Sequence, residues 1–189
     1  MVAGKGIVHS ERTADEDLNR DVPMEGIQTW IGLPAADEPT DPRFDHVPAD
    51  ALPAFARGGV QYRLIVSAAF GEEVAEVKTF SPIFYLHGEA PAGAAIDLPE
   101  EHTERAIYVV TGRLTFAGGT VDPNQMVVFA PGAAPDIRAD AATRFMQLGG
   151  APLDGKRTIW WNFVSSNKDR LESAKTLWRD GGFPVAPGD

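Results

Sequence analysis

The sequence predicts an all-β barrel or sandwich followed by one C-terminal helix, and three observations support this fold class. Short apolar runs of strand length follow one another along most of the 189 residues. Glycine (19 residues) and proline (15 residues) fall between these runs, as they do in the turns of all-β domains. Apolar residues adopt helical spacing only near the end of the chain.

The strands are predicted in order from these apolar runs. Residues 27–33, "IQTWIGL", alternate well enough to form a strand that stops at Pro34. Residues 36–58 are rich in acidic residues and proline, which predicts a linker. A β-rich segment follows over residues 60–70. Further strands are expected within residues 83–87, 94–98, 106–110, 113–116, 124–132, 135–139, 144–148 and 158–164.

Two local signals define a turn and the helix. Thr111-Gly112 lies between two β-rich runs and predicts a hairpin, with Gly112 at the position that must tolerate positive φ. A helix is expected over residues 166–182, where Ser166 or Asn167 is a suitable N-cap and a Gly-Gly pair ends the pattern. Its apolar residues have helical spacing: Leu171, Ala174, Leu177 and Trp178.

Composition and charge exclude several classes of function. The net charge is -10, and the closest approach to a basic patch, Lys156-Arg157, has only two residues, so we expect no direct binding of nucleic acid. The apolar stretches are too short to cross a bilayer, so no membrane association is expected. The chain has no cysteine, which excludes disulfides and thiolate chemistry and suits a cytoplasmic location.

A His-x-Glu pair near the start of the chain is the first candidate site. His9 and Glu11 lie within residues 4–12, "GKGIVHSER". On a strand, their side chains would point to the same face and could reach one ion. Imidazole and carboxylate together suit iron, manganese, zinc or nickel. Because such sites usually take three or four protein donors, a metal site and a polar segment without function both stay open.

The order of several motifs points to a known family. The chain opens on "GKGIVHSE" and "GIQTWIGLP", and continues through "DPRFDHV", "IYVVTGRLTFAG", "VVFAPG" and "LGGAPL". This order resembles the pirin family of the cupin superfamily, over essentially the whole chain. Pirins are bicupins, so the resemblance implies an all-β cupin fold with one C-terminal α-helix.

The resemblance also implies how the domains are arranged. Residues 1–35 would be the remnant of an N-terminal cupin, and residues 36–58 a Pro-rich linker. Residues 59–165 would form a complete C-terminal cupin barrel, followed by the helix over residues 166–182. Because pirins are longer than this chain, we expect it to be N-terminally truncated and to lack most of the metal-binding first cupin.

The resemblance further implies a metal-dependent activity. Pirins hold a metal with two histidines of an early His-Pro-His motif and with a later histidine and glutamate, on which His9 and Glu11 fall. These two residues would be metal ligands for Fe(2+) or another divalent transition metal, and Glu11 would also be a catalytic base. Relatives include quercetin 2,3-dioxygenases, which implies an oxidoreductase acting on a flavonol. Since no His-Pro-His occurs in the sequence, we expect this chain alone to be inactive or to bind metal weakly.

Two alternatives to an enzyme remain. Some pirins are regulatory partners of other proteins, so the chain could be a non-enzymatic cupin module that binds a protein. It could also be an incomplete gene product without an independent function.

The remaining histidines give weaker signals. In the second barrel, Leu98 and Glu100 occupy the positions of the usual His-x-His pair of a cupin, so this barrel is predicted to lack a metal. His102 is interpreted as a loop histidine near acidic residues. His46 and His87 have no partner close in sequence, and both are interpreted as structural or solvent-facing.

Overall fold

The computed structural model describes residues 1–13, 15–21, 23, 25–66 and 73–186. The chain forms two compact units. Unit 1 comprises Met1–Phe44 and Leu153–Asp189, and unit 2 comprises Asp45–Pro152. Unit 2 is therefore one continuous stretch, whereas unit 1 is assembled from the two ends of the chain.

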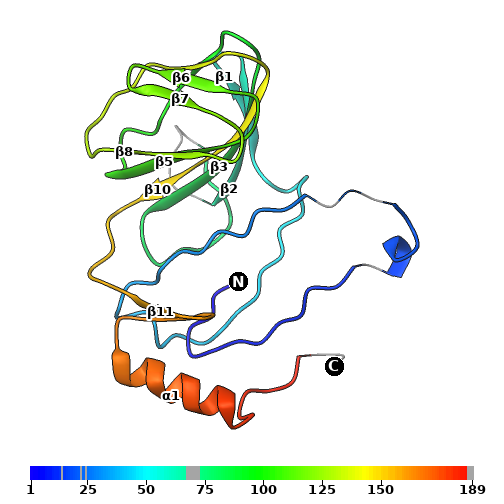
Figure 1. The fold of residues 1–189 in the computed structure, drawn as a ribbon, viewed down its shortest axis with the longest axis vertical. Coiled ribbons are helices and arrows are strands. Elements are labelled where there is room, and N and C mark those ends of the chain that lie inside the picture. Colours follow the sequence, from blue (N-terminus) through cyan, green and yellow to red (C-terminus); the bar gives the residue numbers. More distant parts are fainter. Residues whose placement is uncertain (14, 22, 24, 67–72, 187–189) are drawn as a thin grey trace. The chain divides into compact units, whose positions relative to one another are not determined.

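Unit 2 consists of two antiparallel sheets (Figure 1). The larger sheet has six strands, in the order β1-β2-β3-β10-β5-β8. Their bounds are Ala54–Arg57, Val60–Val66, Ile83–Ala90, Thr143–Gly150, Glu104–Thr111 and Met126–Phe129. The smaller sheet has four strands, in the order β4-β9-β6-β7. Their bounds are Ala95–Ile96, Ile137–Ala139, Leu114–Phe116 and Gly119–Val121.

The hydrophobic core lies between these two sheets. Along β2 and β3 buried side chains alternate with more exposed ones, which is the pattern of a sheet that buries one face. The core residues come from both sheets, as expected when a barrel closes on its own interior. They include Leu64, Leu86, Ile107 and Phe145 from the larger sheet, and Ile96, Leu114 and Ile137 from the smaller one.

The predicted hairpin at Thr111-Gly112 is wrong, although the turn is present. Gly112 has φ +82°, as its position requires. However, β5 pairs with β10 and β8, whereas β6 pairs with β7 and β9, so the chain passes from one sheet to the other at this turn. The turn is held by β10: Arg113 N donates to Thr143 Oγ1 at 3.1 Å. A local turn signal cannot tell these two outcomes apart, because strand pairing depends on distant residues.

The N-terminal side of unit 2 contains a hairpin that the sequence prediction missed. Strand β1 lies within residues 36–58, where a linker was expected, and it pairs with β2 in register from Ala54 to Arg57. Gly58 and Gly59 connect the two strands with φ +59° and +83°. Positive φ at both central residues is typical of the type I′ turns that join twisted antiparallel strands.

Unit 1 contains little regular structure. It has a short 3-10 helix η1 (Asp15–Asp17), a hairpin of β11 (Thr158–Trp160) and β12 (Phe163–Ser165), and the helix α1 (Lys168–Arg179). Residues 158–164, predicted as one strand, are thus two strands that pair around a turn. Trp161 in this turn has φ +49°, a conformation rare for residues other than glycine and one that the sequence does not signal.

The strand predicted over residues 27–33 is absent, and these residues form no regular structure. Ile27, Trp30 and Ile31 are 47%, 52% and 50% exposed. Apolar alternation makes a strand only where another strand supplies hydrogen bonds and a packing surface. Within the described part of the chain, no strand pairs with this segment.

A buried ion pair joins the two chain segments of unit 1. Glu38 is 7% exposed, and its Oε1 lies 2.8 Å from Arg157 Nε. Ser165 Oγ donates to Glu38 Oε2 at 2.7 Å, and Ser166 N donates to Oε1 at 2.8 Å. Arg170 donates to the backbone carbonyl of Glu38 at 3.0 Å. One carboxylate therefore holds the β11–β12 hairpin, the start of α1 and the N-terminal segment together.

Helix α1 is present where the sequence predicts it. Asn167 is the N-cap, and its Oδ1 accepts from Asp169 N at 2.9 Å and from Arg170 N at 3.1 Å. After the helix, Gly181 has φ +68°, and Gly182 N donates to Leu177 O at 2.8 Å. A glycine in this conformation commonly ends a helix. Among the described residues α1 is the one α-helix and the rest of the regular structure is mostly strand, which confirms the predicted all-β fold class.

Replacing Asn167 with Ala is expected to lower the free energy of unfolding of unit 1 by about 1 kcal/mol, because two backbone N–H groups lose their acceptor. Asn167→Asp keeps an acceptor and should change the stability much less. Denaturant unfolding followed by tryptophan fluorescence would measure both. Equal losses for the two variants would show that the cap contributes nothing.

Candidate functional site

Backbone and side-chain contacts hold the beginning of the N-terminal segment that carries His9 and Glu11. Val2 and Arg43 exchange backbone hydrogen bonds of 2.8 and 3.0 Å. Lys5 N donates to Thr40 O at 2.9 Å, and Lys5 Nζ pairs with Asp41 at 2.8 Å. These contacts fix residues 2–5 against residues 40–43 within unit 1. The predicted ligand pair begins four residues beyond them.

His9 and Glu11 are both exposed and lie on irregular backbone. Residues 7–13 form no strand, so strand geometry does not turn the two side chains to one face. Neither side chain makes a hydrogen bond or an ion pair with the described residues, so both are available to an external ligand. Among the described residues no group of three or more His, Asp or Glu side chains could hold a metal. Two donors fall short of the usual three or four, so this pair alone does not fit a metal centre.

The other histidines lie apart from this pair. His102 is in the loop before β5, as predicted, but it is only 7% exposed, and its ring lies 4.8 Å from that of Phe84. His87 lies within β3, where burial lowers its pKa, opposed by the nearby Glu89. His46 is exposed. None of these three positions contributes to a cluster of metal donors among the described residues.

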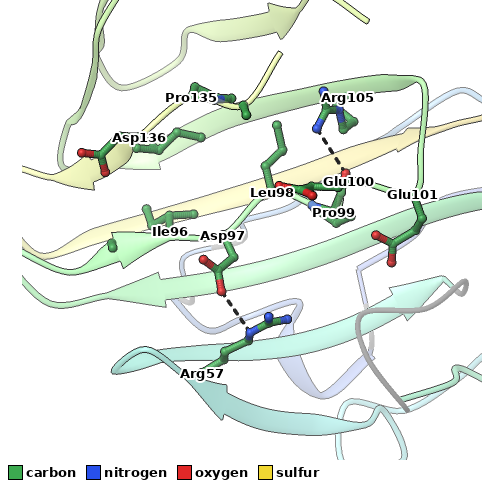
Figure 2. A pocket seen from close by; sticks show the side chains of 13 residues that line it. Arg57, Ile96, Asp97, Leu98, Pro99, Glu100, Glu101, Arg105, Pro135 and Asp136 are labelled. Carbon is green, nitrogen blue, oxygen red and sulfur yellow. Dashed lines mark hydrogen bonds and ion pairs between the residues drawn. The ribbon is translucent and has the colours of Figure 1, made fainter. Parts of the chain in front are cut away.

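The barrel of unit 2 contains a pocket (Figure 2). It has a volume of about 540 Å³, within the range of small-molecule sites. Leu98 and Glu100, which stand at the expected metal positions of a cupin, line it, and they offer one exposed carboxylate instead of two imidazoles. That this barrel lacks a metal stays a prediction from the sequence.

A buried arginine in this pocket is a residue that the sequence analysis missed. Arg105 is 3% exposed and lies at the start of β5. It is on the same side of the strand as Ile107 and Val109, both fully buried. The sequence "RAIYV" could have indicated this burial, because Arg105 stands two residues before Ile107 and therefore faces the same side of a strand as the core positions.

A family model described as "Pirin C-terminal cupin domain" matches residues 85–184, which is more than half of the chain. The chain belongs to the pirin family. The match also confirms the resemblance found in the sequence motifs.

Individual pirin relatives extend the similarity beyond that domain. A pirin-like protein of Caulobacter vibrioides is 44% identical over 96% of this chain and 62% of its own length. A pirin-like protein of Solanum lycopersicum is 27% identical over 92% of this chain and 60% of its own length. The chain thus spans about three fifths of the length of these curated relatives.

A solved structure supports the cupin fold of this pirin. Quercetin 2,3-dioxygenase from Acinetobacter baumannii has a TM-score of 0.74 and 26% sequence identity. The similarity covers 85% of this chain and 54% of the solved chain. The predicted cupin fold is therefore confirmed. Within the described residues, no helix has the length and apolar character needed to cross a membrane.

Proposed function

We propose that this pirin takes part in quercetin 2,3-dioxygenase-type oxidation of a flavonol at a divalent transition metal. The observation that carries this proposal is the similarity to the Acinetobacter baumannii quercetin 2,3-dioxygenase, with a TM-score of 0.74 and 26% identity. In the proposed assignment His9 and Glu11 are two of the metal ligands, and further donors from outside the described residues complete the site. Fe(2+) is the metal that we favour.

The local chemistry of the pair supports these roles. A bound divalent metal would supply Lewis-acid and redox chemistry that side chains lack. Both side chains are exposed, so a metal or substrate reaches them without displacing packed residues. The Glu11 carboxylate would in addition accept a proton from a substrate hydroxyl. With only two donors, the chain by itself would hold metal weakly.

We also propose a domain assignment for this pirin. Residues 1–35 would be the end of a metal-holding first cupin, residues 36–58 a linker, and residues 59–165 a second cupin without metal. The boundary between the compact units near residue 45 supports a division within residues 36–58, whereas β1 pairs with β2 of the barrel and residues 153–165 belong to unit 1. A regulatory role through a protein partner, and a cytoplasmic location, stay predictions.

Metal titration of the purified chain tests the ligand assignment. We expect weak binding of Mn²⁺, followed by water-proton relaxation, because two ligands leave most of the coordination sphere to water. His9→Ala and Glu11→Ala should each weaken binding at least about tenfold. His46→Ala, a matched control at another exposed histidine, should leave it unchanged. Tight binding that survives His9→Ala would contradict the assignment.

The activity is tested separately with quercetin. Oxygen consumption by the Fe²⁺-loaded chain alone should stay close to the background rate. It should rise when a polypeptide that carries the missing histidine donors is added, and this rise should vanish with Glu11→Ala. An unchanged rate under all of these conditions, with metal bound, would overturn the proposed reaction.

A further inference from the structure

Arg105 is buried inside the barrel of unit 2, and no described residue provides a counter-ion for its charge. The Arg105 guanidinium donates to the Ala133 carbonyl at 2.6 Å and, at the longer distance of 3.5 Å, to the Pro99 carbonyl. Its Nε has no hydrogen-bond partner. No carboxylate among the described residues forms an ion pair with it. Buried charges are normally paired, because removing an ion from water costs several kcal/mol.

The pocket of about 540 Å³ lies directly beside this guanidinium. Figure 2 shows Arg105 at the pocket, with the segment from Ile96 to Glu101 forming one wall. Its apolar lining consists mainly of Ile96, Leu98, Pro99, Pro135 and Ile137. The pocket thus combines an apolar wall with charged side chains, of which Arg105 is the buried one, and such a combination can orient a small organic ligand.

The wall of the pocket is fixed from inside the barrel. Gln147 is fully buried on β10, and its Nε2 donates to the Asp97 carbonyl at 2.7 Å. Asp97 also pairs with Arg57 at 2.9 Å, as the second dashed line in Figure 2 shows. Because of these contacts, the segment beside Arg105 is held in place before any ligand arrives, which reduces the entropic cost of binding.

The charges around the pocket restrict the class of ligand. Arg57 is neutralised by Asp97, so Arg105 is the cation that an incoming anion would meet. Glu100, Glu101 and Asp136 are exposed and also line the pocket. These carboxylates would repel a dianion such as phosphate. They would accept hydrogen bonds from a hydroxyl or amino group at the other end of a ligand.

We propose that this pocket binds a small organic monocarboxylate. Its carboxylate pairs with Arg105, its apolar body lies against Leu98 and the neighbouring apolar wall, and a donor group at its far end meets the acidic side chains. Arginine suits this role because its planar guanidinium binds carboxylates through two parallel hydrogen bonds. The site is separate from His9 and Glu11 and does not depend on the proposed oxidation.

NMR titration of the full chain with 4-hydroxybenzoate tests the proposal. The Arg105 side-chain Nε–H resonance, assigned by its loss in Arg105→Lys, should shift and saturate as the carboxylate is added. The neutral analogue 4-hydroxybenzamide, and inorganic phosphate, should bind at least about tenfold more weakly. No saturable shift, or equal binding of the carboxylate and the amide, would overturn the proposal and leave Arg105 as a clamp between two carbonyl groups.

Two variants give an independent measure of the same site. Arg105→Lys keeps the charge but not the planar fork, so it should weaken 4-hydroxybenzoate binding at least about tenfold. Arg63→Lys, at an exposed position of β2, should bind as the unaltered chain does. Equal affinity of all three chains would contradict the assignment. Should Arg105→Lys fail to fold, the comparison of carboxylate and amide on the unaltered chain decides.

Discussion

Replacing Glu38 with Ala is expected to lower the free energy of unfolding of unit 1 by about 3–5 kcal/mol. The variant would leave Arg157 Nε without its partner, although Asp154 would still pair with the guanidinium, and the Ser165 and Ser166 donors would lose their acceptor. Each of these buried donors left without an acceptor costs about 1–3 kcal/mol, more than the loss of a surface ion pair. We expect this single change to have one of the largest effects in the molecule.

Tryptophan fluorescence during denaturant unfolding measures this loss selectively. The four tryptophans lie in unit 1, at positions 30, 160, 161 and 178. The matched control is Glu172→Ala, which removes an exposed carboxylate paired with the half-buried Lys175 and should change stability by at most about 1 kcal/mol. If the two variants lose similar stability, the Glu38 network does not hold unit 1 together.

The same carboxylate predicts how the stability of unit 1 depends on pH. Burial raises the pKa of Glu38, but the hydrogen bonds from Ser165 and Ser166 and the charge of Arg157 outweigh this, so its pKa lies below the ordinary value. Its stabilisation is therefore complete above the ordinary glutamate pKa and is lost as the pH falls through the lowered one. In Glu38→Gln this acid-dependent loss should be smaller, as acid titration of the tryptophan fluorescence would show.

Phe145→Ala is expected to lower the free energy of unfolding of unit 2 by about 3–5 kcal/mol. Phe145 is fully buried on β10, opposite Gly88 of β3. Its ring meets that of Tyr62 edge-on at 6.2 Å. A Cβ at Gly88 would collide with the Phe145 ring, so the ring occupies the space that this glycine leaves. Its removal leaves a cavity in the middle of the core.

Tyrosine absorbance follows the unfolding of unit 2, because the three tyrosines, at positions 62, 85 and 108, all lie in this unit. Val128→Ala, at a 71% exposed position of β8, is the matched control and should cost less than about 1 kcal/mol. Gly88→Ala should be destabilising alone but much less so together with Phe145→Ala. Additive losses from the two changes would contradict the close packing of this pair.

The elements predicted well from the sequence are those with local signals. The Asn167 cap and the glycines after the helix define α1 by hydrogen bonds within a few residues. Gly112 was assigned a positive φ correctly, but the partner of each flanking strand was not, because pairing depends on residues far away in the sequence. The strand predicted over residues 27–33 is wrong for the same reason: its apolar and polar residues alternate, yet no described strand pairs with it.

The candidate sites differ in how far the sequence could define them. His9 and Glu11 came from a motif, and their burial and surroundings could not be inferred from it. The sequence places Arg105 in line with Ile107 and Val109, but only the structure shows that its charge lacks a carboxylate partner among the described residues. Such an inference needs the identity of neighbours that are distant along the chain, such as Ala133.

The discontinuous make-up of unit 1 has a consequence for the order of folding during synthesis. Residues 45–152 are contiguous, so unit 2 can fold as soon as they have left the ribosome. Unit 1 has to wait, because Glu38 finds Arg157, Ser165 and Arg170 only after the last part of the chain has emerged. Within residues 1–189, the internal unit 2 can therefore fold before unit 1, which contains the residues that precede it in the chain. Until residues 157–170 have been synthesised, residues 1–44 lack the partners of Glu38 and stay accessible to chaperones and proteases.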